Sequence, residues 1–163
     1  MKKNIFIIIA VCLLVAIIAF AINSNKQNTA PQFNSTNIIN KQIINEKNFL
    51  DKITILNFWY PSCPGCVQEM PQLIAFHQQY SKLPNFQTIA ISLNLNTENE
   101  VIDYTQKYKL PFIVSYDTDG SVAKAYDVVL APTTFLIDEQ GNIVRRYLGE
   151  PDWQELKAYI EKQ

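Results

Sequence analysis

The stretch Asn57–Cys66 reads NFWYPSCPGC and places two cysteines three positions apart. Paired cysteines at this spacing occur in metal sites, in short structural disulfides and in redox centres. The residues before them, Ile53–Tyr60, form an apolar run rich in branched and aromatic side chains, which predicts a buried strand. The cysteines therefore follow the carboxyl end of a strand, where the reactive groups of α/β folds collect.

Strand and helix patterns alternate along the rest of the chain. The segment Pro64–Lys82 carries apolar residues on two faces, which indicates a broadly buried helix. Thr97 followed by Glu100 is the signature of a capping box at the start of the next helix. The further expected elements, in chain order, are a helix 46–51, a strand 86–95, a helix 98–108, a strand 112–115, a helix 119–126, strands 133–138 and 143–148, and a helix 152–161. This order predicts an α/β fold in which helices flank a mixed central sheet, with parallel crossovers first and an antiparallel pair last.

The amino terminus differs in composition from the rest of the chain. After two lysines, the run Ile5–Ile22 contains no charged residue. As a helix it would be about 27 Å long, just short of a bilayer core of about 30 Å. We therefore predict that residues 1–22 form a transmembrane helix that anchors the protein, with its start inside and the following domain exported. A cleaved signal peptide is the alternative, because residues 19–21, AFA, fit the small-x-small rule for cleavage, although the apolar run exceeds a usual signal core of about 7 to 15 residues.

Both alternatives export the domain, so we expect it on the periplasmic or extracytoplasmic side of the membrane. Residues 23–45 are rich in Asn, Gln, Ser and Thr, and this composition predicts a flexible linker. Residues 46–163 are then expected to form one folded domain. The net charge of −1 and the scattered lysines provide no basic surface for phosphates, so nucleic acid is not an expected partner.

The spacing of Cys63 and Cys66 favours redox chemistry over the two other uses. A disulfide across two residues constrains little of the unfolded chain, so it would be a weak staple. A closed zinc site needs about four ligands. The remaining cysteine, Cys12, lies in the apolar segment, and the one histidine, His77, lies about 16 Å along the helix from Cys66. We therefore expect no metal and no other cofactor.

As a redox pair, the two cysteines have different expected roles. Cys63 at the helix start is expected to be exposed, to face the positive end of the helix dipole and to attack as the nucleophile. Cys66, one turn later, is expected to resolve the mixed disulfide. A peroxidase centre does not fit, because Leu56 and Tyr60 occupy the positions before Cys63 where that pattern needs Pro and Thr.

Further motifs accompany the cysteine pair across residues 45–160. They are NFW at 57–59, Glu69-Met70-Pro71 after the second cysteine, DTDGSVAKAYDV at 117–128, PTTFLID at 132–138 and DEQGNIV at 138–144. With these motifs the chain resembles the membrane-anchored, exported TlpA/ResA/DsbE group of thiol-disulfide reductases, which have the thioredoxin fold and serve cytochrome c maturation and related reductive tasks. The resemblance implies a thioredoxin-like fold and dithiol exchange through a redox disulfide of Cys63 and Cys66.

The resemblance also implies roles for residues near the cysteines. Pro132 is expected to be cis and to face the cysteines, and Ala131 is expected to present its backbone to an incoming substrate chain. Glu69 is expected to be an acid near the active site that moves a proton. The expected substrate-binding residues are Trp59, Pro64, Ala131, Pro132 and Thr133.

Three departures from the general thioredoxin pattern bear on the redox behaviour. Asn57 stands where thioredoxins carry a buried Asp, Ser62 stands where they carry Trp, and the order Pro64-Gly65 is reversed. Pro64 has no amide to donate to a thiolate. We therefore expect a modestly lowered Cys63 pKa and a reducing pair.

The expected function is that of an exported, membrane-tethered thiol-disulfide reductase. It would receive electrons from a membrane thiol transporter and pass them to oxidised protein thiols, with apocytochrome c as one candidate substrate. A dithiol oxidase or isomerase and a redox-silent binding module that keeps the fold are the alternatives.

Overall fold

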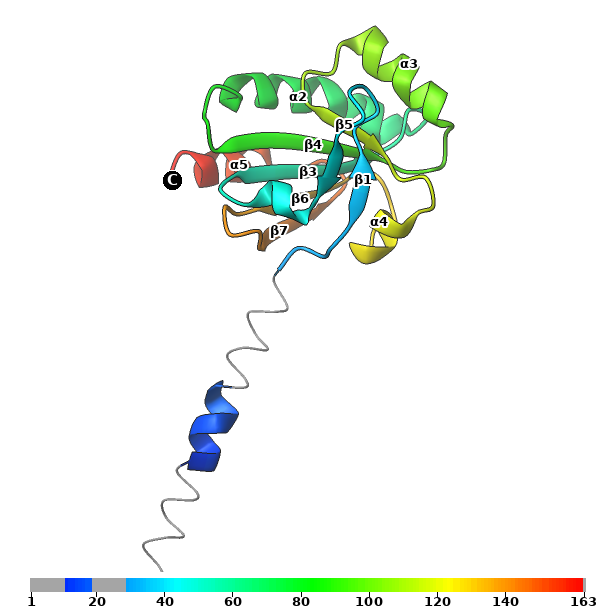
Figure 1. The fold of residues 1–163 in the computed structure, drawn as a ribbon. Helices are drawn as coiled ribbons and strands as arrows, with labels where there is room; N and C mark the ends of the chain where they lie inside the picture. Colours follow the sequence, from blue (N-terminus) through cyan, green and yellow to red (C-terminus); the bar gives the residue numbers. More distant parts are fainter. Residues whose placement is uncertain (1–10, 19–28, 163) are drawn as a thin grey trace, which may run out of the picture.

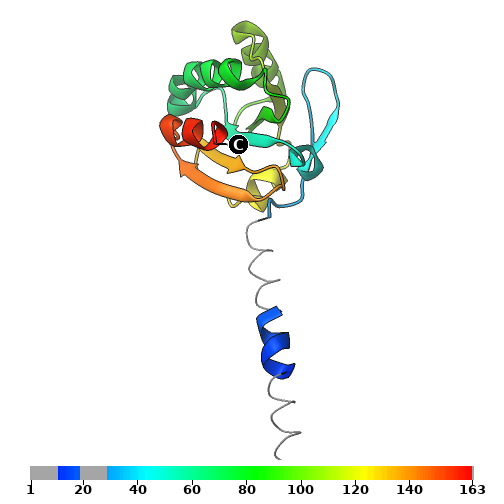
Figure 2. The ribbon, with the colours of Figure 1, turned by 90° about the vertical axis from the view of Figure 1, so that its left-hand side faces the viewer.

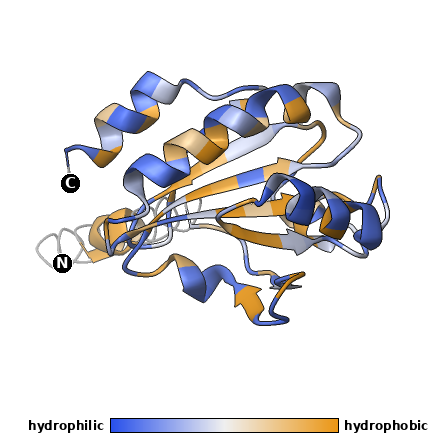
Figure 3. Cartoon of the chain, turned by 90° about the horizontal axis from the view of Figure 1, so that it is seen from above, coloured by the Kyte–Doolittle hydropathy of each residue, from blue (hydrophilic) through white to orange (hydrophobic). Residues whose placement is uncertain are grey.

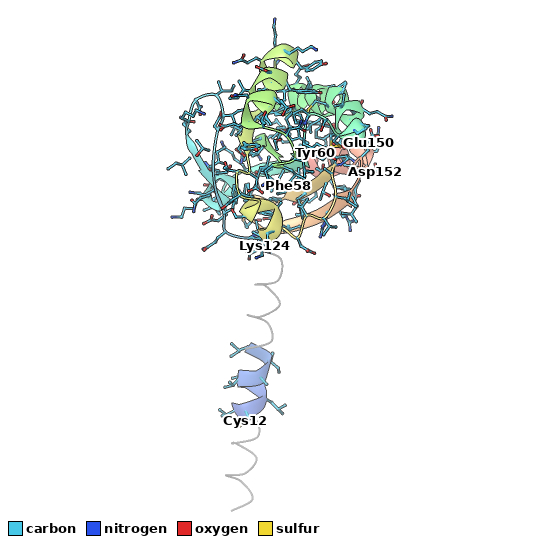
Figure 4. All side chains as sticks on the ribbon, turned by 90° about the vertical axis from the view of Figure 1, so that its right-hand side faces the viewer. Cys12, Phe58, Tyr60, Lys124, Glu150 and Asp152 are labelled. Atoms are coloured by element: carbon cyan, nitrogen blue, oxygen red, sulfur yellow. A yellow bond between two sulfur atoms is a disulfide. The ribbon has the colours of Figure 1, made fainter. Side chains whose placement is uncertain are left out.

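The computed structural model describes residues 11–18 and 29–162, and Figure 1 shows their ribbon. Residues 11–18 form a helix, on which Figure 4 labels the free and exposed Cys12. Within the described residues, no helix has the length and hydropathy that a membrane crossing requires. The other residues of the predicted anchor, 1–10 and 19–22, lie outside the described part of the chain.

The domain is built on a five-stranded sheet with the strand order β5-β4-β3-β6-β7. The central strand β3 (Ile53–Trp59) pairs in parallel with β4 (Phe86–Ser92), which pairs in parallel with β5 (Ile113–Tyr116). On its other side, β3 pairs antiparallel with β6 (Thr133–Ile137), which pairs antiparallel with β7 (Ile143–Leu148). The predicted mixed sheet, with parallel strands first and an antiparallel pair last, is confirmed.

Helices cover both faces of the sheet, as Figure 2 shows. The face of Trp59 is covered by three helices, namely α2 (Pro64–Tyr80), α3 (Glu98–Tyr108) and α5 (Trp153–Ile160). The face of Phe58 is covered by two short helices, namely the 3-10 helix η1 (Glu46–Phe49) and α4 (Ser121–Ala125). Figure 3 shows hydrophobic residues concentrated in the strands between them, with hydrophilic residues on the outer sides of the helices.

Every residue of β3 is buried, because the strand is covered on both faces. Alternation along the strand sends Ile55, Asn57 and Trp59 to the face of α2, and it sends Leu56 and Phe58 to the opposite face. This double burial explains why the strand reads as a continuous apolar run. Since each fully buried large apolar side chain contributes about 1.5 to 3 kcal/mol, β3 is a main source of the stability of the domain.

The other predicted elements agree with the structure to within a few residues at their ends. α3 has the predicted bounds, and Thr97 and Glu100 form the predicted capping box in full. The expected helix at 46–51 is the single 3-10 turn η1, capped by the side chain of Asn45. Helix α4 is shorter than the predicted helix 119–126.

The predicted flexible linker 23–45 is wrong over residues 29–45, which fold against the domain. Within this segment, β1 (Asn34–Thr36) and β2 (Ile43–Asn45) form an antiparallel hairpin. Residues 23–28 lie outside the described residues.

Long-range contacts explain why a polar segment folds. The amide of Ile38 donates to the carbonyl of Val114 in β5 over 2.9 Å, which extends the edge of the sheet. The Phe33 ring stacks on Phe49 with the ring centroids 5.7 Å apart. The buried apolar side chains of the segment are those of Ala30, Phe33, Ile38 and Ile44. These widely spaced residues anchor the segment although its average composition is polar.

Candidate active site

Cys63 and Cys66 lie at the start of α2, directly after the carboxyl end of β3. Cys63 is the N-cap residue with an extended backbone, and Pro64 at the first helical turn supplies the fixed φ angle that a helix start favours. The Sγ atom of Cys63 accepts a hydrogen bond from the backbone amide of Cys66 over 3.1 Å. The two sulfurs are joined in a disulfide, and the two Cα atoms lie 5.2 Å apart. The helix start therefore directs the amide of Cys66 and its positive dipole end at the Cys63 sulfur.

Both cysteines are buried in this disulfide form, with exposed fractions of 3% for Cys63 and 1% for Cys66. The expectation that Cys63 is exposed is therefore wrong. Its side chain folds back to cap the helix, and its Sγ atom lies 3.7 Å from the carbonyl oxygen of Ala131. An incoming thiol or disulfide has to reach this sulfur across a rim on which Pro64 and Gly65 are exposed.

The loop before β6 lies against the cysteine pair. The Ala131–Pro132 peptide bond is cis, as the resemblance implied. Pro132 lies so close to the first turn of α2 that a Cβ atom added to Gly65 would lie 3.3 Å from its Cδ atom. The carbonyl of Pro132 accepts a hydrogen bond from the amide of Gly149 over 2.8 Å. The loop is thus held between α2 and the end of β7.

Two of the five expected substrate-binding residues belong to the core. Trp59 and Thr133 are fully buried, so their side chains are not exposed to a substrate in this form, and their expected part in substrate binding stays a prediction. Both are strand residues covered by packed helices, and the sequence motif does not reveal that cover. Of the other three, Pro64 is exposed, Ala131 is partly exposed and Pro132 is buried.

Glu69 lies one turn after Cys66 on α2 and has only 3% of its surface exposed. The side-chain amide of Asn57 donates one hydrogen bond to Oε1 of Glu69 and another to the hydroxyl of Thr134, each over 2.9 Å. Asn57 and Thr134 are direct partners across β3 and β6. The second carboxyl oxygen of Glu69, Oε2, is buried without a hydrogen-bond partner in the described structure. These three side chains form a buried polar group, the Asn57–Glu69–Thr134 cluster.

Burial and, to a lesser degree, the negative charge of Glu150 raise the pKa of Glu69 to about 8, against an opposing hydrogen bond from Asn57. In the disulfide form this carboxyl is therefore protonated at neutral pH. Glu150 follows β7, and Tyr60 follows β3 just before the cysteine pair. Both strands run antiparallel to β6, so Glu150 and Tyr60 lie at the same end of the sheet, which is the end that carries the site (Figure 4). An amide at Asn57 suits this environment, because it donates to the carboxyl without adding a second negative charge.

The sequence patterns did not indicate two side chains that contact the site, those of Thr134 and Asn96. The side-chain oxygen of Asn96 accepts hydrogen bonds from the amide and the hydroxyl of Ser62, over 3.2 and 2.7 Å. The hydroxyl of Tyr116 donates to the Asn96 carbonyl over 2.8 Å. Asn96 lies just beyond the carboxyl end of β4, and Ser62 lies just beyond the carboxyl end of the neighbouring strand β3. The parallel pairing of these two strands was therefore the signal that could have placed Asn96 near Ser62.

The order of the strands and the disulfide at the start of a helix, facing a cis-proline loop, are those of a thioredoxin-like fold that carries out dithiol-disulfide exchange. The molecule is therefore a thiol-disulfide oxidoreductase. Comparison with known proteins gives its family: the chain belongs to the AhpC/TSA family, whose model matches residues 27–146.

Individual relatives agree with this class. The thiol-disulfide oxidoreductase ResA of Bacillus thuringiensis subsp. konkukian (strain 97-27) is 34% identical over 133 residues, which are 82% of this chain and 75% of that protein. The solution structure of a candidate thioredoxin from Neisseria meningitidis shares 38% identity with a TM-score of 0.75, over 83% of this chain and 89% of that one. The crystal structure of StoA from Bacillus subtilis shares 27% identity with a TM-score of 0.68, over 82% of this chain and 98% of that one. The expected thioredoxin-like fold of the domain and the expected enzyme class are thereby confirmed.

Proposed function

We propose that the protein is an exported, membrane-tethered thiol-disulfide reductase that passes electrons from a membrane thiol transporter to oxidised protein partners. One observation carries the direction of transfer. Among the described residues, the amide of Cys66 is the hydrogen-bond donor to the Cys63 sulfur, and Pro64 has no amide to add. A Cys63 thiolate that accepts few hydrogen bonds is weakly stabilised, so the disulfide form of the pair is favoured over the dithiol form. A pair that favours its disulfide form gives up electrons readily and acts as a reductant.

In the proposed reaction, the Cys63 thiolate attacks one sulfur of the substrate disulfide. A bond forms between these two sulfurs while the substrate disulfide breaks, and the second substrate sulfur leaves as a thiolate that takes up a proton. The Cys66 thiolate then attacks Sγ of Cys63, which releases the first substrate sulfur and leaves the Cys63–Cys66 disulfide. Two electrons have then passed to the substrate, and a dithiol donor must return them before the next cycle.

Glu69 is proposed to move the proton of Cys66. The two residues are three positions apart on α2 and both are buried, so they lie on the same side of the helix. A group with a pKa of about 8 can both give and take a proton near neutral pH. When the disulfide is reduced, the protonated carboxyl would give its proton to the departing Cys66 sulfur, and in the reverse step the carboxylate would take it back.

The substrate and the cellular setting are part of the same proposal. The backbone of Ala131 lies against the Cys63 sulfur and the Pro64 ring is exposed at the rim, so both are placed to contact a substrate chain. The apolar run Ile5–Ile22 supports the anchor and the extracytoplasmic location. A role in cytochrome c maturation rests on the resemblance to the TlpA/ResA/DsbE group.

The reduction potential of the cysteine pair tests the direction of transfer. The full-length protein is equilibrated in thiol-disulfide buffers of known potential, and the fraction of disulfide is measured by thiol labelling. The expected midpoint lies closer to the about −270 mV of thioredoxin than to the about −120 mV of DsbA. A midpoint near the higher value would replace the proposed reductase by a dithiol oxidase or isomerase.

Trapping of mixed disulfides tests the roles of the two cysteines. A Cys66→Ser variant should accumulate disulfide-linked partners through Cys63, which mass spectrometry can identify. A Cys63→Ser variant is the matched control, and it should capture no partner and lose all turnover. If Cys63→Ser retained the function in cells, the redox-silent binding module would be the better interpretation.

A further inference from the structure

A groove of about 410 Å³ lies between the segment that carries the cysteine pair and the exposed side of α3. One wall contains Ser62, which precedes Cys63, and Val67, which follows Cys66. The other wall is formed by α3 and includes Glu100, Asp103, Tyr104 and Tyr108. The residues that flank the cysteine pair in the sequence therefore line this α3 groove, and the proposed exchange between the cysteines makes no use of it.

The apolar part of the α3 groove is fixed to the core. Val67 and Tyr108 are 38% and 48% exposed. The Tyr108 ring packs on the Tyr104 ring with centroids 4.3 Å apart, and Tyr104 packs on the buried Trp59 at 5.0 Å. Aromatic rings that are already held in place lose little conformational entropy on binding, which makes them effective contact residues at interfaces.

The α3 groove also carries negative charge. Glu100 and Asp103 are exposed, and no ion pair among the described residues involves either carboxylate. Hydrogen bonds from the backbone amide and the hydroxyl of Thr97 lower the pKa of Glu100, so this group is ionised at neutral pH. The cation in the described lining is Lys107, and its Nζ atom lies 5.2 Å from the ring centroid of Tyr108.

We propose that the α3 groove binds the segment of an oxidised protein substrate that flanks its reacting cysteine, and that it prefers a segment with an aromatic or large aliphatic residue next to Lys or Arg. This inference rests on the proposed thiol exchange at Cys63. While the substrate sulfur meets Cys63, the chain on one side of it passes Ala131, and the chain on the other side enters the groove. The apolar side chain would cover the exposed valine and tyrosine, and the basic side chain would meet the two carboxylates.

Two peptides linked to thionitrobenzoate test this preference. Both contain one cysteine followed by Phe, and they differ only in whether Lys or Glu comes next. Each is mixed with the pre-reduced full-length protein, and the release of thionitrobenzoate gives a second-order rate constant. The Lys peptide should react about 10-fold faster at low salt, and the ratio should approach one as salt is added. Equal rate constants at low salt would overturn the proposal.

Charge-removing variants assign the preference to the groove. The double variant Glu100→Gln with Asp103→Asn should lower the rate constant of the Lys peptide about 5-fold. It should raise the rate constant of the Glu peptide, because two like charges are removed, and it should leave a small disulfide unaffected. Gln at position 100 preserves the capping box. Glu98→Gln on the same helix is the matched control, because Glu98 pairs with Lys41 and does not line the groove. A loss shared by all substrates, or an equal loss in the control, would contradict the proposal.

Unreactive peptides separate the groove from the proposed function. With Ser in place of Cys, the Lys peptide should still bind the full-length protein more tightly than the Glu peptide in a fluorescence titration. If no disulfide were reduced but this preference persisted, the proposed function would fall and the groove would stand. If exchange proceeded but the two peptides bound and reacted equally, the groove would fall and the proposed function would stand.

Discussion

Glu69 and Glu100 are two glutamates on neighbouring helices beside the cysteine pair, and their surroundings are opposite. Glu69 is buried in the Asn57–Glu69–Thr134 cluster, and its pKa is raised to about 8. Glu100 is exposed on α3, where hydrogen bonds from Thr97 lower its pKa. A glutamate carboxyl can thus carry a proton at neutral pH where water is excluded, as at Glu69. It is a permanent negative charge where hydrogen bonds and solvent stabilise the ionised form, as at Glu100. The difference predicts that Glu69 governs chemistry and pH dependence, whereas Glu100 governs recognition.

The largest expected effect is the pH dependence of stability caused by Glu69. Its pKa in the folded protein is raised from 4.5 to about 8, so between these values the unfolded chain has lost the proton that the folded chain still holds. The contribution of protonated Glu69 to the free energy of unfolding is fully present below the unfolded pKa of 4.5. It is lost as the pH rises through the folded pKa of about 8. At about 1.4 kcal/mol per pKa unit, the total loss approaches about 5 kcal/mol.

Urea unfolding from pH 4 to pH 9 measures this loss when wild type is compared with Glu69→Gln. The Gln variant lacks the titrating group, so the difference between the two free energies of unfolding should fall steadily across the window and become constant above it. A difference that does not depend on pH would show that Glu69 is ionised in the folded protein.

Asn57 provides the next largest effect, because its side chain donates to both other members of the cluster. Asn57→Ala should cost about 2 kcal/mol, since it leaves a buried carboxyl without a partner. It should also raise the pKa of Glu69 further, because the hydrogen bond that it removes lowers this pKa. Glu150→Gln should shift the same pKa downward, since it removes a negative charge that raises it.

Infrared titration of the Glu69 carboxyl band would measure both shifts. Thr134→Val is the matched control, because it removes the other acceptor of Asn57 and keeps the bond to Glu69. We expect it to cost a similar stability and to leave the titration midpoint in place. Shifts of the same sign in Asn57→Ala and Glu150→Gln would contradict the assigned causes.

A smaller effect is expected on the rate at which an external thiol reduces the Cys63–Cys66 disulfide. Protonated Glu69 can transfer its proton to the departing Cys66 sulfur, whereas the amide of Gln cannot, so Glu69→Gln should slow this step about 10-fold at pH 7. The loss stays moderate because a thiolate already leaves readily. After correction for the thiolate content of the reagent, the wild-type rate should fall above pH 8 and the variant rate should stay flat in stopped-flow measurements. A parallel fall in both proteins would exclude Glu69 as the acid.

The sequence predicts the parts of this site that depend on neighbours along the chain. The run Ile53–Trp59 indicates the buried strand, and Pro64 after Cys63 indicates the start of a helix. Thr97 with Glu100 marks the start of α3 correctly. In each case the structure follows from residues within a few positions of each other in the sequence, so local patterns are sufficient to predict it.

The features that sequence patterns missed depend on contacts between distant residues. Cys63 is buried partly because it lies against the carbonyl of Ala131, which is 68 positions later in the chain. The fold of segment 29–45 depends on partners such as Phe49 and Val114, which composition does not reveal. The burial of Trp59 likewise depends on the helices that cover the sheet. Average composition and local period carry no information about such pairings.

The smallest expected effect belongs to Glu100, and it is the sharpest test of the contrast with Glu69. Glu100→Gln alone should slow reduction of a Lys-containing peptide disulfide about 3-fold at low salt, because one exposed charge contact is lost. Added salt should abolish this difference, since exposed charges are screened within about 10 Å at 0.1 M. The same variant should keep the wild-type pH dependence of stability and the wild-type rate with a small disulfide, because Glu100 has no part in the buried cluster. A change in the titration near pH 8 would show that the two carboxyl groups are coupled, and the division between proton transfer and recognition would then fail.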